Sequence, residues 1–141
     1  MAERVNTAIS FDYQLRVFYE DTDAGGIVYY ANYLKFAERA RTEWLRALGI
    51  SQSYFLEQNL GFVVRRVEMD NKASARLDDL LTISTTIKQL KKASLTFEQA
   101  IKNQDGTLLC QLTVLVASVN LQRAKPCAIP EQILGALTNA L

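Results

Sequence analysis

Residues 19–33, YEDTDAGGIVYYANY, combine a group suited to acid–base chemistry with groups suited to binding an anion. Asp23 is followed by Gly25 and Gly26, and an aromatic run then leads to a helical pattern that begins at Asn32. A helix N-terminus offers backbone N–H groups without intrahelical partners and the positive end of the helix dipole. Glycines let backbone and ligand approach closely. The spacing therefore predicts that a carboxylate and an array of N–H donors face the same small space.

The composition narrows this chemistry, because the chain contains no histidine. Histidine-dependent nucleophile pairs, His-ligated metal sites and imidazole proton shuttles are thereby excluded. The two cysteines, Cys110 and Cys127, are too few for a structural zinc site, and we expect buried free thiols in a reducing cytosol. Proton transfer must come from carboxylates, Lys, Tyr or backbone groups, and we expect neither a metal nor an organic cofactor.

Length and charge exclude several classes of protein. With 141 residues and 49% hydrophobic content, the chain is expected to form one domain, residues 1–141, with a substantial core. A net charge of +1 argues against a nucleic-acid binder, which would show a basic excess. No apolar run approaches the roughly 20 residues that span a bilayer. The N-terminus, MAERVNTAIS, lacks the apolar stretch of a signal peptide, so we expect a cytoplasmic protein.

The elements flanking the motif are a strand and a long helix. Residues 11–19 alternate apolar and polar, which predicts a strand with one apolar face made of Tyr13, Leu15, Val17 and Tyr19. From Asn32 onward, apolar residues recur every three or four positions, which predicts a helix with a buried stripe: Tyr33, Phe36, Ala37, Ala40, Trp44 and Leu48. Gly49 stands where a helix C-terminus is expected. We expect two ion pairs on the exposed helix face, Glu38 with Arg41 and Arg39 with Glu43.

The remaining chain predicts a short helix over residues 51–58 that ends at Gly61, and then four strands. The strands cover residues 62–70, 80–90, 93–102 and 108–120, and NQDG predicts a hairpin turn between the last two. One face of the strand over residues 80–90 consists of Leu81, Ile83, Thr85 and Ile87. Pro130 suits the first turn of a C-terminal helix with apolar residues Ile133, Leu134, Leu137 and Leu141. One helix on an antiparallel sheet is an α+β arrangement. The apolar strand 108–119 must be covered on both faces or join an oligomer interface.

The chain resembles the hotdog-fold acyl-CoA thioesterases in four segments that occur in the family's order. They are YEDTDAGGIVYYANYLKFAERARTEWLR, FVVRRVE, ARLDDLL and SLTFEQAI. The resemblance covers residues 11–130 and is to the 4-hydroxybenzoyl-CoA thioesterase type, within it to the branch associated with the bacterial Tol–Pal operon. It implies a long central helix wrapped by a curved five-stranded antiparallel sheet. It also implies subunits that join their sheets edge to edge, with active sites at the seam, as dimers or dimers of dimers. The substrate would be an acyl-CoA, and the alternative carrier is acyl carrier protein.

The resemblance assigns roles to residues of the motif. Asp23 would be the catalytic carboxylate, either a general base or a nucleophile, and an apolar wall of Val28, Tyr29 and Tyr33 would make it a stronger base than in water. Close relatives often have histidine at the position of Tyr30, so here the backbone N–H of this residue would polarise the thioester carbonyl. Gly26 would let the substrate approach. Two residues remain open: Tyr19 would line the pocket or end the first strand, and Asp21 is expected to be a turn residue.

Further charged residues are candidates for catalysis or for binding coenzyme A. A second hotdog subtype uses a helix glutamate as catalyst, but the charged neighbours of Glu38 and Glu43 favour a solvated salt-bridge face. The candidates for binding coenzyme A phosphates are Arg65, Arg66, Arg76, Lys91 and Lys92. Hotdog dehydratases and hydratases usually depend on histidine, which disfavours them here. The main alternative to an enzyme is a non-catalytic scaffold that binds acyl groups or acyl carrier protein.

Overall fold

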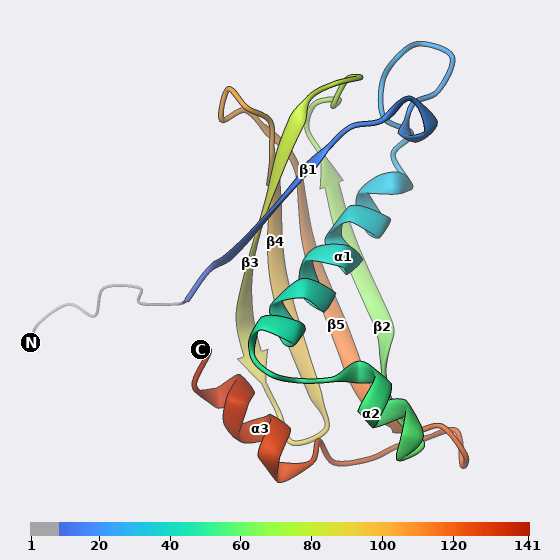
Figure 1. Ribbon diagram of the computed structural model, residues 1–141, viewed down its shortest axis with the longest axis vertical. Coiled ribbons are helices and arrows are strands. Elements are labelled where there is room, and N and C mark those ends of the chain that lie inside the picture. Colours follow the sequence, from blue (N-terminus) through green and yellow to red (C-terminus); the bar gives the residue numbers. More distant parts are fainter. Residues whose placement is uncertain (1–8) are drawn as a thin grey trace, which may run out of the picture.

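The fold is a curved antiparallel sheet with a long helix across one face, as seen in the computed structural model, which describes residues 9–141 (Figure 1). The main strands are β1 (Phe11–Arg16), β2 (Leu60–Asn71), β3 (Leu80–Leu90), β4 (Ser94–Lys102) and β5 (Leu108–Asn120). Their order in the sheet is β1-β3-β4-β5-β2, and the short β6 (Lys125–Pro126) pairs with the end of β5. This confirms the expected α+β hotdog arrangement. Residues 1–8, which make up most of the N-terminal segment MAERVNTAIS, lie outside the described residues, so the expectation about a signal peptide concerns a part of the chain that the structure does not describe.

The long helix α1 (Asn32–Ala47) follows the predicted apolar stripe. The predicted residues Tyr33, Phe36, Ala37, Ala40 and Trp44 are buried, and Leu48 is half-buried just after the helix. The helix ends in a Schellman motif: the Gly49 N–H donates to the Arg46 carbonyl at 3.0 Å and the Ile50 N–H to the Leu45 carbonyl at 2.9 Å. Gly49 has φ +81°, a left-handed conformation that favours glycine. The sequence therefore placed the end of α1 correctly.

The expected ion pairs on α1 are wrong. Arg41 is buried and donates to the Gln99 side chain rather than pairing with Glu38. Arg39 lies over the Phe36 ring at 5.9 Å, and Glu43 pairs with Arg46, one turn further along the helix. Spacing alone could not separate these outcomes, because position 41 lies at the border between the exposed face and the buried stripe.

The strands match the predicted alternation with small shifts. On β3, the side chains of Leu81, Ile83, Thr85 and Ile87 are all buried beneath α1, as expected. The NQDG segment joins β4 to β5, and Gly106 in it has φ +80°. The first strand, however, ends at Arg16 rather than at residue 19. Gly61 lies inside β2 and does not end the second helix, α2 (Gln52–Glu57); Asn59, with φ +59°, makes that turn.

Within the single chain, the strand expected over residues 108–119 is buried on one face only, and its predicted role in an oligomer interface stays a prediction. β5 is an interior strand between β4 and β2, and only one of its faces packs against the core. β2 and β1 are the two edge strands, and the Val63, Val64 and Val67 side chains of β2 are 38–45% exposed. β5 is therefore paired on both sides, and the unpaired backbone edges of the sheet belong to β2 and β1 rather than to residues 108–119.

The two shorter helices pack at the end of the sheet far from the start of α1 (Figure 1). They are α2 and α3 (Glu131–Thr138), and Pro130 immediately precedes α3 as predicted. Cys110 and Cys127 are free thiols, the first buried and the second half-buried. Burial raises the pKa of Cys110 to about 11, so this thiol is protonated at neutral pH and is a poor nucleophile. Among the described residues, no helix has the length and apolar character to cross a membrane.

Candidate active site

The loop between β1 and α1 is held in place by backbone and side-chain hydrogen bonds. It begins with a short 3-10 helix, η1 (Tyr19–Asp21), where the Asp21 carboxylate accepts the Phe18 N–H at 2.9 Å. The Asp21 carbonyl accepts the Asn32 side-chain amide at 2.9 Å and the Tyr29 N–H at 3.2 Å. Asp21 therefore ties the loop to the first residue of α1, which is the structural role expected for it.

The turn that carries Asp23 is tight. The Asp23 N–H donates to the Ile27 carbonyl at 2.9 Å, and the Asp23 Oδ1 atom accepts the Gly25 N–H at 2.8 Å. Gly26 has φ +76°, and its N–H donates to the Asp23 carbonyl at 3.1 Å. A Cβ atom at position 25 would lie 3.3 Å from Asp23 Oδ1. The two glycines thus let the turn close around Asp23 and fix the direction of its carboxylate.

Asp23 opens onto a cavity of about 370 Å³ at the start of α1. The aromatic run contributes Tyr29, Tyr30 and Tyr33, together with Ile27 and Val28. The end of β2 contributes Asn71, and the chain after it contributes Lys72, Ala73 and Ser74. Tyr33 is buried and its hydroxyl accepts the Ala75 N–H at 2.9 Å, which fixes the cavity wall. Burial raises the pKa of Tyr33, so its hydroxyl is neutral at neutral pH. Five residues assigned from the sequence, Asp23, Val28, Tyr29, Tyr30 and Tyr33, are therefore brought to one cavity.

Unused N–H donors lie just before α1 rather than in its first turn. The N–H groups of Asn32, Tyr33 and Leu34 donate to the carbonyls three residues earlier, at 2.8–3.2 Å. The N–H groups of Tyr30 and Ala31 have no acceptor within residues 9–141. No side chain caps this end of the helix either. The Tyr30 backbone donor is thus free to bind an oxygen atom of a ligand.

The apolar enclosure expected around Asp23 is not supplied by the single chain. The Asp23 side chain is exposed, and so are the Tyr29 and Tyr30 rings, which are tilted against each other at 5.1 Å. Only Val28 and Tyr33 form a buried wall. Tyr19 is 81% exposed in η1, beyond the end of β1, and does not line the cavity. Desolvation of Asp23 would therefore need a bound substrate or a second subunit.

The five predicted phosphate ligands do not lie together. Arg66 is paired with Glu68 at 2.9 Å, and Arg65 occupies a bulge in β2. The Arg76 backbone bridges to Ile27 close to the loop, but its side chain does not line the cavity. Lys91 and Lys92 lie in the turn between β3 and β4, at the opposite end of the sheet from the start of α1 (Figure 1). None of the five lines the Asp23 cavity.

Sequence reasoning missed the cation that does line this cavity. Lys72 follows β2 directly, and its ammonium group pairs with Asp70 at 2.9 Å. The segment Asn71–Ser74 carries no motif that marks it as part of a site. It lies just before ARLDDLL, one of the segments that resemble the hotdog thioesterases. It reaches the site because β2 runs the length of the sheet and ends beside the start of α1.

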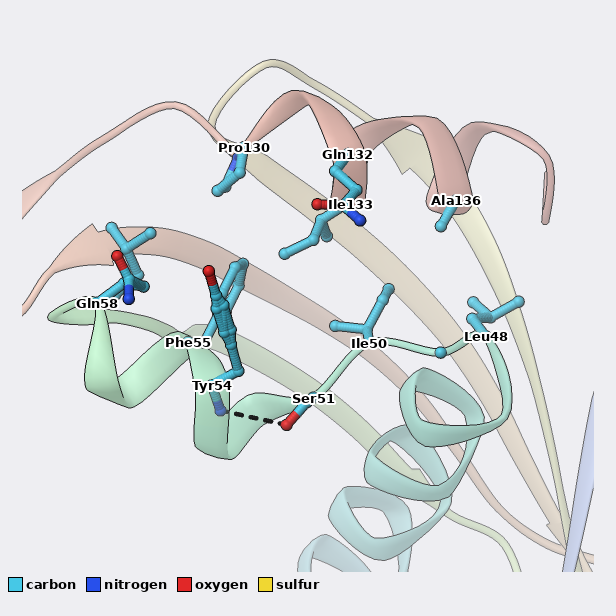
Figure 2. A pocket seen from close by; sticks show the side chains of 12 residues that line it. Leu48, Ile50, Ser51, Tyr54, Phe55, Gln58, Pro130, Gln132, Ile133 and Ala136 are labelled. Atoms are coloured by element: carbon cyan, nitrogen blue, oxygen red, sulfur yellow. Dashed lines mark hydrogen bonds between the residues drawn. The ribbon is translucent and has the colours of Figure 1, made fainter.

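A larger cavity of about 590 Å³ lies between α2 and α3, at the far end of α1 (Figure 2). Its walls are largely apolar, with Leu48, Ile50, Phe55, Ile133 and Ala136 facing one another across it. Ser51 accepts the Tyr54 N–H at 3.1 Å and so caps α2 at one wall. The cavity contains no carboxylate, so it offers space for an apolar group but no base.

Comparison with known proteins places this geometry in context. Residues 17–137 match the Thioesterase-like superfamily. The chain is 46% identical over 127 residues to an acyl-CoA thioesterase YbgC from Haemophilus influenzae, covering 89% of this chain and 93% of that protein. A probable thioesterase from Bartonella henselae is 38% identical, with a TM-score of 0.77 over 86% of this chain and 99% of that structure. A Staphylococcus aureus protein solved with CoA is 17% identical, with a TM-score of 0.88 over 98% of this chain and 87% of that structure, and so shares the fold.

Proposed function

Because the chain belongs to the thioesterase-like superfamily, we propose that it hydrolyses acyl-CoA thioesters to a free acid and coenzyme A at the cavity beside Asp23. The observation that carries this proposal is the convergence of an exposed carboxylate and a free backbone donor. Asp23 and Tyr30 line one cavity, and the Tyr30 N–H has no acceptor within the described chain. Residues 1–141 would act as one thioesterase domain.

The chemistry follows from the two groups. The thioester oxygen accepts a hydrogen bond from the Tyr30 N–H, and this bond strengthens as negative charge develops on the oxygen. As a general base, Asp23 takes a proton from water while the water oxygen bonds to the carbonyl carbon. The carbon–sulfur bond then breaks, and the coenzyme A sulfur leaves as a thiolate that takes up a proton. As a nucleophile, an Asp23 oxygen would instead bond to the carbonyl carbon while the carbon–sulfur bond breaks and the thiolate leaves, and water would later hydrolyse the resulting anhydride to the free acid and Asp23.

The site is completed, in this proposal, by a second copy of the chain. β2 is an edge strand with exposed valines, and two copies can pair along it antiparallel about a two-fold axis. Asn71 lines the Asp23 cavity and Leu60, at the other end of β2, lines the cavity between α2 and α3. Antiparallel pairing centred on β2 would place the Asp23 cavity of one copy next to the cavity between α2 and α3 of the other copy, across the interface. The partner's apolar cavity would then receive the acyl chain.

The carrier and compartment belong to the same proposal. Coenzyme A would be bound by cations from both copies, with Lys72 beside the cavity and Lys91 and Lys92 contributed from the opposite end of the other subunit. Acyl carrier protein is the alternative carrier of the acyl group. The two free cysteines agree with a reducing, cytoplasmic environment.

Substitution of Asp23 by Asn tests the proposed base. Asn keeps the oxygen that accepts the Gly25 N–H, so the turn is expected to persist. We expect turnover to fall at least about a hundredfold, as is typical of losing a positioned acid–base group. Release of free thiol from a panel of acyl-CoAs measures this.

Asp21→Asn is the matched control, because Asn again keeps an acceptor for the Phe18 N–H. This variant should retain turnover within a few-fold of the wild type. Hydrolysis by folded Asp23→Asn protein at the wild-type rate would remove Asp23 from the mechanism. No thiol release from any acyl-CoA by folded wild-type protein would favour the non-catalytic binding scaffold.

A further inference from the structure

The middle of α1 carries a buried arginine that does not line the Asp23 cavity. Arg41 is only 8% exposed, and its Nη1 group donates to the Gln99 Oε1 atom at 2.9 Å. The Gln99 amide nitrogen donates to the Ala37 carbonyl at 2.9 Å and to the Thr85 hydroxyl at 3.0 Å. Because both amide hydrogens are used, the Gln99 oxygen must face Arg41. The guanidinium is therefore held in one orientation by a neutral partner.

Arg41 has no direct counter-ion in the described chain. None of the ion pairs among residues 9–141 includes it. Glu38 is close enough to act on its charge but does not contact it, and burial lowers the pKa of Arg41 from its ordinary value. A charged group that is taken out of water without an ion partner is destabilising unless something neutralises it. An anion that reached Arg41 would supply that missing interaction.

Arg41 lines a cavity of about 220 Å³. Within residues 9–141, every fully enclosed side-chain nitrogen and oxygen has a partner, so the guanidinium nitrogens of Arg41 without one retain some exposed surface. One part of the cavity wall is apolar and consists of Leu45, Phe62, Val64, Leu95, Phe97 and Val116. Glu38, Thr42 and Gln52 form its polar part.

We propose that this cavity binds the carboxylate of a small organic acid, with the acid's oxygens on the Arg41 guanidinium and its short apolar tail against the Phe62 and Phe97 side. A guanidinium and a carboxylate match as two parallel hydrogen bonds, which favours a carboxylate over a spherical anion. The volume is below the roughly 300–1,000 Å³ of sites for drug-sized ligands, which limits the tail to a ring or a short chain. Such acids are also what thioester hydrolysis releases, but the binding proposal does not require that activity.

Titration with benzoate and hexanoate, each compared with its uncharged amide, tests the proposal by calorimetry. We expect saturable binding of at least one acid, and at least about tenfold weaker binding of the amide of the same shape, as expected for loss of a charge-assisted pair. Arg41→Met should lose acid binding by a similar factor. Arg39→Met, on the exposed side of the same helix, is the matched control and should bind the acid like the wild type.

Two further variants keep the proposal testable if Arg41→Met does not fold. Glu38→Gln removes the negative charge that borders the cavity and should tighten acid binding without changing amide binding. Thr42→Met fills part of the cavity and should weaken acid binding while leaving Arg41 in place. Asp23→Asn should bind the acid like the wild type, which separates this site from the proposed thioesterase site. Equal acid binding by the wild type and folded Arg41→Met, or no saturable binding to the wild type up to about 10 mM, would overturn the proposal.

Discussion

At the scale of single residues, the proposed site combines the Asp23 carboxylate with a backbone N–H group. The first-turn N–H groups of α1 are occupied by the preceding carbonyls, while the N–H of Tyr30 is left without an acceptor in residues 9–141. The Tyr30 ring is exposed and contacts the neighbouring Tyr29 ring. We therefore expect the contribution of Tyr30 to come from its backbone N–H rather than from its hydroxyl.

Tyr30→Phe and Tyr30→Pro separate the two possible contributions of this residue. Phe keeps the ring and the N–H, so turnover should stay within a few-fold of the wild type. Proline has no N–H, and the loss of one oxyanion donor typically lowers turnover by about 10²- to 10³-fold. The proline variant removes no hydrogen bond from the described fold, and circular dichroism checks that it folds. If Tyr30→Phe loses as much turnover as Asp23→Asn, the hydroxyl takes part in the reaction and the backbone assignment is wrong.

At the scale of elements, the end of α1 sets where α2 begins and so shapes the cavity between α2 and α3. The Schellman motif at Gly49 reverses the chain, and Ser51 then caps α2. Gly49 has φ +81°, and an added Cβ atom there would meet nothing within 4 Å. The requirement for glycine is thus a matter of backbone conformation alone.

Gly49→Ala and Gly135→Ala form a matched pair that tests this. Gly135 lies inside α3, and a Cβ atom there also meets nothing within 4 Å. Gly49→Ala should lower the free energy of unfolding by about 1–2 kcal/mol, the cost of a left-handed conformation for a residue with a Cβ atom. Gly135→Ala should raise it by about 0.5–1 kcal/mol, because alanine favours a helix interior. Urea unfolding measures both, and changes of the same sign would contradict this account of Gly49.

At the scale of the whole molecule, one face of the sheet is covered by α1, but the β2 edge is open. The β2 edge carries Val63, Val64 and Val67 near its centre, which is an aggregation hazard for a monomer and a natural surface for a second copy. The exposed position of Asp23 agrees with a site that a second subunit encloses. The single chain is therefore expected to be half of the functional unit.

Val67→Glu should dissociate the dimer, because a two-fold axis near the centre of β2 brings the two introduced carboxylates close together. Val67→Thr, which keeps the β-branched shape without charge, should remain dimeric and active. Sedimentation at the assay concentration reports the oligomeric state, and thiol release reports activity. An active monomer, either wild-type or Val67→Glu, would contradict the idea that the site needs two copies.

The sequence by itself determined the elements, because periodicity, glycine and proline act locally. The stripe from Tyr33 to Trp44, the cap at Gly49, the NQDG turn and the buried face of β3 are all where the pattern predicted them. The grouping of Asp23 with Val28, Tyr29 and Tyr30 was also predictable, since these residues share one short loop. Only the tertiary structure decided which strand forms the open edge, because strand order depends on long-range pairing. It likewise brought Lys72 to the site and turned Arg41 inward onto Gln99, 58 residues away in the chain. Those outcomes depend on which elements meet in space, and no local pattern in a single sequence records that.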